Sequence, residues 1–189
     1  IGKLDVKNNS SEYIIYEDHN FKVTPNLKCA TKDDQSSVSS ENDLANHKST
    51  NTTRCVTMYF EIDYNIYLQN GSDTTNTTNW MTSVFNNVQT LYNNDTINIA
   101  LKSMYIWTTQ DPYEGAGTSS SDYLFLFNAT RPVFNGDVGQ LVGIDSGGLG
   151  GVAVTINGLC STNNFSYSDV DISYNTVPTY SWTVQVITH

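Results

Sequence analysis

The feature that most restricts the fold of this chain is a hydrophobic period that changes from that of a strand to that of a helix and back again. Apolar residues alternate with polar ones over residues 56–68, which predicts a β-strand. Over residues 75–92 the large apolar side chains recur at helical spacing, as Trp80 and Val84 do, which predicts an amphipathic helix. Residues 97–107 return to β-like composition. These elements form a βαβ unit, so the two strands are expected to be parallel.

The following residues predict further elements of the same sheet. Residues 123–127 form a short apolar stretch that predicts a second helix, and residues 137–145 predict another strand. A glycine-rich sequence at 147–151 leads into the apolar run 152–156. Glycines at this density let another backbone approach closely, although a plain flexible turn explains them equally well. A polar loop is predicted from Cys160 to about Asn175.

A final helix is predicted at the end of the sequence. Pro178 is typical of a first helical turn, and Trp182, Val186 and His189 then recur at helical spacing. The apolar pattern reaches His189 without a terminating Gly or a basic last turn, so the helix is expected to continue beyond it. Together the elements predict an α/β (α+β) fold, a twisted mixed sheet with crossover helices and the start of one more helix.

Residues 1–54 differ in composition and are predicted to form a separate segment. They contain one plausible strand at 13–16 and then a polar tract at 31–53 without apolar periodicity, which is typical of a linker. Seven of the nine Lys and Arg lie in this segment, so residues 55–189 carry two basic against eleven acidic residues, a net charge of 2 − 11 = −9. A field of that sign repels phosphates and disfavours nucleic acid as a partner. No apolar run is long enough to span a membrane.

Residues 177–189 (VPTYSWTVQVITH) closely resemble the helix that enters the zinc motif of the metzincin metallopeptidases. In that motif, HExxHxxGxxH, two His one helical turn apart bind zinc, the Glu between them is the general base, and a Gly turns the chain toward a third His. The resemblance extends over residues 55–189, in which Gly150-Gly151-Val152-Ala153 looks like the strand at the edge of the metzincin cleft. The sequence is most similar to the adamalysin-like (reprolysin-like) secreted members found in bacteria.

The resemblance implies a secreted zinc-dependent metalloendopeptidase that hydrolyses peptide bonds with zinc-activated water. His189 would be the first zinc ligand. The general-base Glu and two further His would follow it, so these 189 residues would be truncated at the first His of the motif and are expected to be inactive and not to hold zinc. Protein or peptide substrates would pair by β-augmentation with the edge strand near Gly150, Gly151 and Val152.

The three cysteines allow two interpretations. Cys29 lies in a segment that resembles the end of a propeptide, and its thiolate would then be a latency ligand for the zinc. Alternatively, Cys29 pairs with Cys55 in a disulfide and Cys160 pairs with a cysteine beyond residue 189, which the frequency of disulfides in secreted proteins favours. His19 and His47 lack ligand spacing and are interpreted as solvated side chains.

Other functions have weaker support in the sequence. Glu61 and Asp63 lie two positions apart on one strand face and are interpreted as a solvated polar face, rather than as a calcium site or an acid–base pair. The glycines at 147–151 lack the Lys-Ser/Thr ending of a phosphate-binding loop. The alternative to a peptidase is a non-catalytic extracellular module that binds peptide or glycan ligands at the same strand edge.

Overall fold

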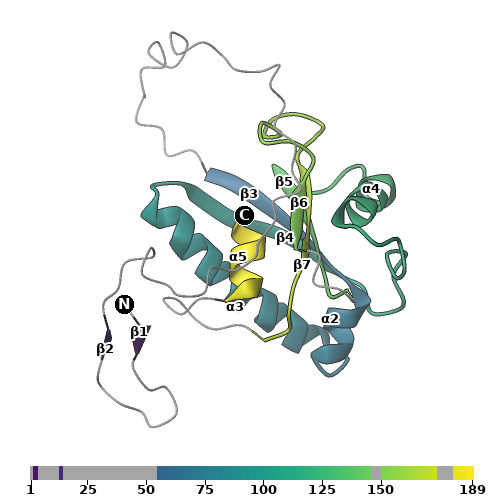
Figure 1. Cartoon of the computed structure of the whole chain (residues 1–189), viewed down its shortest axis with the longest axis horizontal. Helices are drawn as coiled ribbons and strands as arrows, with labels where there is room; N and C mark the ends of the chain where they lie inside the picture. Colours follow the sequence, from purple (N-terminus) through teal and green to yellow (C-terminus); the bar gives the residue numbers. More distant parts are fainter. Residues whose placement is uncertain (1, 4–12, 15–54, 146–149, 174–180) are drawn as a thin grey trace.

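The computed structural model describes residues 2–3, 13–14, 55–145, 150–173 and 181–189. Within them, five strands form one sheet in the order β4-β3-β5-β7-β6 (Figure 1). Neighbouring strands are parallel, except that β6 runs antiparallel to β7. This mixed sheet with helices confirms the predicted α/β fold class.

The predicted βαβ unit is present at one side of the sheet. β3 (Cys55–Ile62) and β4 (Asn98–Ile106) are parallel neighbours, and α3 (Thr74–Asn94) connects them. The helix begins after Asp73, whose side chain accepts a hydrogen bond from Asn76 N at 2.8 Å. Its predicted apolar face is buried against the sheet. The hydrophobic period therefore predicted both the type and the order of these elements correctly.

The first strand is shorter than the alternating pattern predicts. It ends at Ile62, and the helix α2 (Tyr64–Gln69) begins directly after Asp63. Asp63 Oδ1 accepts a hydrogen bond from Ile66 N at 2.7 Å, which caps the helix and fixes its start. The prediction of a strand over 56–68 is therefore wrong beyond Ile62. The alternation continues in the sequence because Ile66, which is buried from the helix, follows Phe60 and Ile62 at an even spacing.

The remaining elements add one helix and three strands. α4 (Ser120–Thr130) contains the apolar stretch that predicted it, and the Asp122 carboxylate accepts a hydrogen bond from Ser119 N at 3.1 Å before the first turn. β5 (Val138–Gly143) lies beside β3, and β6 (Gly151–Ala153) forms the end of the sheet. The predictions of a helix and two strands in these regions are confirmed.

The prediction of a continuous polar loop after Cys160 is wrong at β7 (Phe165–Asp169). This strand lies between β5 and β6 and pairs with both. Its aromatic residues, Phe165 and Tyr167, are buried on one face, whereas the residues of opposite parity are serines. Ser168 is nevertheless fully buried, because a helix covers that face. A strand with one apolar and one small polar face is thus buried on both sides.

Helices cover both faces of the sheet (Figure 1). α3 and α5 (Trp182–Thr188) lie on one face, where their apolar side chains join Phe60 and Val142 in one buried cluster. α4 lies on the opposite face, over a second cluster that includes Phe127 and Tyr167. The predicted final helix, α5, is therefore packed on the α3 side of the sheet.

Two short strands form a separate pair. β1 (Gly2–Lys3) and β2 (Tyr13–Ile14) are antiparallel, which confirms the strand predicted at 13–16 for its first two residues. The polar tract at 31–53 and Pro178 lie outside the described residues. Among the helices that the structure describes, none has the length and apolar character needed to cross a bilayer.

Candidate functional site

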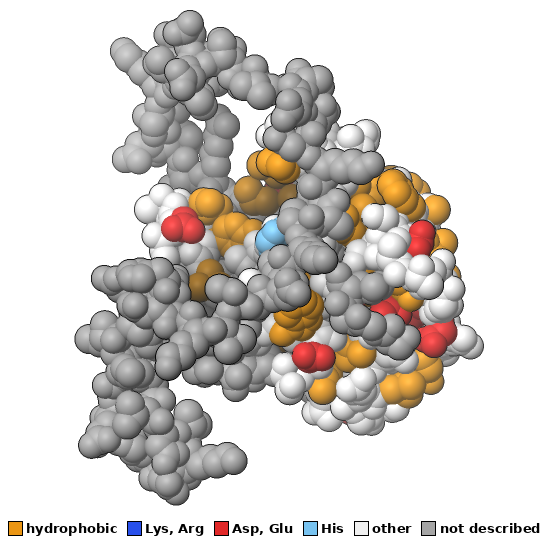
Figure 2. Space-filling model, in the orientation of Figure 1, with side chains coloured by type: hydrophobic (Ala, Val, Ile, Leu, Met, Phe, Trp, Pro, Cys, Tyr) orange, Lys and Arg blue, Asp and Glu red, His pale blue; other side chains and the backbone are white. Residues whose placement is uncertain are grey.

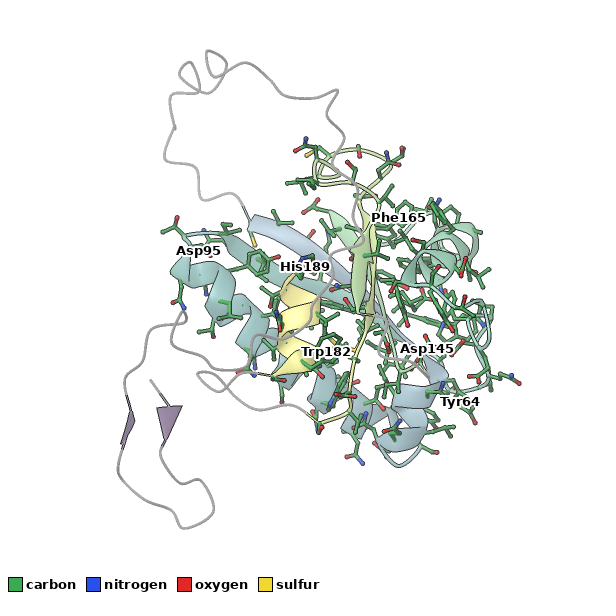
Figure 3. All side chains as sticks on the ribbon, viewed as in Figure 1. Tyr64, Asp95, Asp145, Phe165, Trp182 and His189 are labelled. Carbon is green, nitrogen blue, oxygen red and sulfur yellow. The ribbon has the colours of Figure 1, made fainter. Side chains whose placement is uncertain are left out.

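The helix α5 presents the predicted metal ligand, His189, at its C-terminal end. The Trp182 indole N–H donates to Asp169 O at 3.1 Å and holds the first turn of α5 against the end of β7. At the other end, His189 N donates to Gln185 O at 2.9 Å, so the backbone of His189 continues the helical hydrogen bonding. The imidazole is exposed, and it is the pale-blue surface in Figure 2 and a labelled side chain in Figure 3. The helix α5 thus carries an exposed imidazole at its C-terminal end.

The glycine-rich edge strand lies directly against this helix. β6 pairs with β7 on one side, and its outer edge has no strand partner among the described residues. Gly150, with a φ of +83°, leads into the strand. A methyl group placed on Gly151 would lie 3.2 Å from Val186 Cγ1 and 3.4 Å from Val186 O. A larger residue at position 151 would therefore press on Val186 of α5, which shows how closely the two elements approach at this glycine.

Replacing Gly151 with alanine should weaken the contact between β6 and α5. The added methyl group must displace Val186 or the strand, and overpacking of this kind typically costs about 1–3 kcal/mol of unfolding free energy. Urea denaturation of the two proteins measures the loss. Because Val186→Ala removes the opposing Cγ1 atom, the double variant should lose less than the sum of the two single variants. Strictly additive losses would contradict the close contact.

The other predicted site residues lie elsewhere. Cys55 begins β3, and Cys160, with a φ of +65°, lies in the loop after β6. Both side chains are exposed, and they are not bonded to each other. Cys29, His19 and His47 lie outside the described residues. Both interpretations of Cys29, the disulfide and the latency ligand, therefore stay predictions.

The described residues supply one exposed imidazole and no complete metal site. No group of three or more His, Cys, Asp or Glu side chains in this part of the chain is arranged to hold a metal ion. A catalytic zinc site needs three protein ligands. His189 fits one such position chemically, and the remaining positions would have to be filled by residues outside the described ranges.

Glu61 is the centre of a buried network on the α4 side of the sheet, so its interpretation as part of a solvated face is wrong. Its side chain is fully buried and forms an ion pair with Arg131 Nε at 2.7 Å. Tyr59 OH, Tyr113 OH and Trp107 Nε1 donate to the same carboxylate at 2.6, 2.7 and 2.8 Å. Burial raises the Glu61 pKa, but the bonds from Arg131 and these neighbours outweigh it and hold the pKa below its usual value. The sequence offered no sign of this, because Arg131 lies 70 residues away.

Asp63 is also buried rather than solvated, and it lines a polar pocket. The pocket lies where β3, β5 and β7 end, and its acidic residues are Asp63, Asp111, Glu114 and Asp145. Burial and the nearby charges of Asp111 and Asp145 raise the pKa of Asp63 to about 8, although two backbone N–H groups donate to its carboxylate. Tyr167 OH donates to Asp145.

This pocket is a second polar region that the sequence analysis missed. A signal was available, since Asp63 and Asp145 each closely follow a strand and parallel strands bring such positions to one edge. Figure 3 shows Asp145 and Tyr64 together at this end of the molecule, away from His189. On the face in Figure 2, carboxylates are visible among the described residues and Lys or Arg side chains are not.

Comparisons with known proteins indicate how the chain is related to others. Residues 52–189 match the model of the metallo-peptidase family M12 (Reprolysin_5), which is most of the chain. The structure is similar to the crystal structure of metalloproteinase-II from Bacteroides fragilis, with 15% sequence identity and a TM-score of 0.39 over 65% of this chain and 39% of that chain. The chain thus spans well under half the length of that metalloproteinase. No curated protein sequence matches it.

Proposed function

Because the chain belongs to metallo-peptidase family M12, we propose that it forms the N-terminal part of the catalytic domain of a secreted, zinc-dependent metalloendopeptidase. The observation that supports this most is the contact between Gly151 of β6 and Val186 of α5. Val186 lies one helical turn before His189, so a strand that has no outer strand partner among the described residues packs against the helix that carries the exposed imidazole. Those are the two parts that a peptidase of this kind needs side by side.

The edge strand is proposed to bind the substrate. An extended peptide would add to the outer edge of β6 through main-chain hydrogen bonds with Gly150, Gly151 and Val152. The side chain of Val152 is buried on the α4 side, so the strand is held in place from that face, and its outer edge has no strand partner in the part of the chain that the structure describes. The substrates would accordingly be proteins or peptides.

His189 is proposed as the first of three zinc ligands. Zinc in a complete site activates water for attack on a peptide carbonyl. This chain contributes one ligand through His189, and α5 orients that ligand through its packing on α3 and β7. The remaining ligands and the general base are proposed to follow His189, and the isolated 189-residue chain is accordingly proposed to be inactive. Residues 1–54 are proposed to form a propeptide-like segment and linker.

The test compares the complete natural protein with the 189-residue chain. After dialysis against metal-free buffer, elemental analysis should find one zinc per complete protein and none on the short chain. Hydrolysis of unfolded casein should require the complete protein and stop with a chelator. A complete protein without zinc or proteolysis would contradict the proposal. Metal-independent binding of peptides or glycans by the short chain would favour the non-catalytic module instead.

A further inference from the structure

The last turn of α5 is held by side chains from three different elements. A helix normally leaves its final carbonyl oxygens without partners inside the helix. Here three consecutive carbonyls each accept a hydrogen bond from a side chain: Ser168 Oγ donates to Val186 O at 3.3 Å, Gln140 Nε2 to Ile187 O at 3.4 Å, and Tyr92 OH to Thr188 O at 2.9 Å. The donors come from β7, β5 and α3, so the sheet and the neighbouring helix together hold the turn before His189.

Two of these donors occupy positions where apolar residues would be expected. Gln140 and Ser168 are 4% and 1% exposed, on the sheet face that packs against α5. They bond to each other, because Gln140 Nε2 also donates to Ser168 Oγ at 2.8 Å. Gln140 Oε1 has no hydrogen-bond partner among the described residues.

A buried amide with one unsatisfied atom costs stability. Replacing both Gln140 and Ser168 with apolar side chains of similar size would be nearly neutral or stabilising. Stability alone therefore does not account for the pair. Gln140 and Ser168 instead determine the orientation of α5, since hydrogen bonds restrict the rotation of a helix and its position along its axis more sharply than apolar contacts do.

We infer that Gln140 and Ser168 are positioning residues that fix the last turn of α5, and with it the angle at which His189 stands beside β6. The inference rests on the proposed role of His189 as a zinc ligand. Neither residue is exposed at the site, so both act through the helix backbone. Partners that orient a metal ligand in this way typically change metal affinity rather than fold stability.

The first test uses the 189-residue chain without metal. Gln140→Leu should speed amide hydrogen exchange in the last turn of α5, over residues 186–189, by about fivefold, because one net hydrogen bond contributes about 1 kcal/mol. Ser168→Ala should act in the same direction. Gln89→Leu is the matched control, since Gln89 Nε2 donates to Ile99 O at 2.7 Å, away from α5. It should leave exchange in α5 unchanged. Unchanged exchange in Gln140→Leu would overturn the inference.

The second test uses the complete natural protein. Gln140→Leu should weaken zinc binding roughly 10- to 100-fold in a chelator competition and alter the visible spectrum of the cobalt-substituted protein, while the metal-free protein loses no more than about 1 kcal/mol of unfolding free energy. Gln89→Leu should change neither. If the unaltered protein binds zinc and Gln140→Leu binds it equally well, the positioning role is overturned while the proposed function stands. If the unaltered protein binds no zinc, the proposed function fails and this inference with it.

Discussion

Replacing His189 with alanine in the complete natural protein should abolish zinc-dependent proteolysis. His189 is the exposed imidazole at the end of α5, the helix that packs against Gly151 of β6. Removing one of three ligands should weaken zinc binding by more than about 100-fold, since losing a group that only orients a ligand already costs roughly 10- to 100-fold. Zinc content after dialysis and the rate of casein hydrolysis measure both effects.

The matched control for this variant is His47→Ala. It removes the same side chain from the N-terminal segment, and we expect zinc content and proteolysis to stay at the level of the unaltered protein. Circular dichroism of both variants shows whether the fold is retained. Normal proteolysis by the folded His189→Ala protein would exclude His189 as a ligand, whatever the family of the chain.

The second large effect is expected on stability, from Glu61→Gln. The substitution keeps the shape of the side chain but removes its charge and turns one acceptor oxygen into a donor. Arg131 would lose its ion-pair partner, and up to four donors would face a group that cannot accept from all of them. Breaking a buried pair in this way typically costs about 3–5 kcal/mol of unfolding free energy.

Chemical denaturation at neutral pH measures this loss. Glu114→Gln is the control, because Glu114 is exposed and accepts only from Asn65 Nδ2 at 3.1 Å among the hydrogen bonds of the described residues. We expect that variant to stay within about 0.5 kcal/mol of the unaltered chain. A loss below about 1 kcal/mol for Glu61→Gln would contradict the network as described.

The same network predicts how stability depends on pH. The folded-state pKa of Glu61 is lowered relative to its ordinary value of 4.5, so the unfolded chain binds this proton more readily than the folded chain. Glu61 therefore contributes its full share of the unfolding free energy above a pH of 4.5. This contribution is lost as the pH falls through the lower folded-state pKa. When denaturation is measured at a series of acidic pH values, the unfolding free energy of Glu61→Gln should accordingly fall less steeply with decreasing pH than that of the unaltered chain.

The sequence predicted the parts of the fold whose information is local. The crossover helix was found because its buried residues share one face over many turns, β3 was found from its alternating apolar residues, and β4 was found from its β-like composition. The same reasoning failed at Asp63, where a single side-chain cap ends a strand inside a continuous alternating pattern. It also failed at β7, where serines occupy the face that α5 covers.

The candidate site likewise has features that local sequence predicts and features that depend on residues far apart in the chain. His189 and the edge glycines were predicted through a family resemblance, whereas the approach of Gly151 to Val186 depends on β6 and α5 meeting in space. Gln140, Ser168 and the Glu61 network could not have been found from sequence. Each has a partner that is 28 or more residues away, and a polar residue in a strand looks the same in the sequence whether it is solvated or buried.

The strand order also has a consequence for the synthesis of the chain. β3 is an interior strand of the sheet, yet Tyr59 pairs with Gly139, a residue that the ribosome adds 80 positions later. At roughly 5–20 residues per second, β3 waits roughly 4–16 s for this neighbour. During that time its apolar residues and one row of main-chain groups are open to wrong partners. The yield of folded protein should therefore depend on translation speed and on chaperones more than its final stability would suggest.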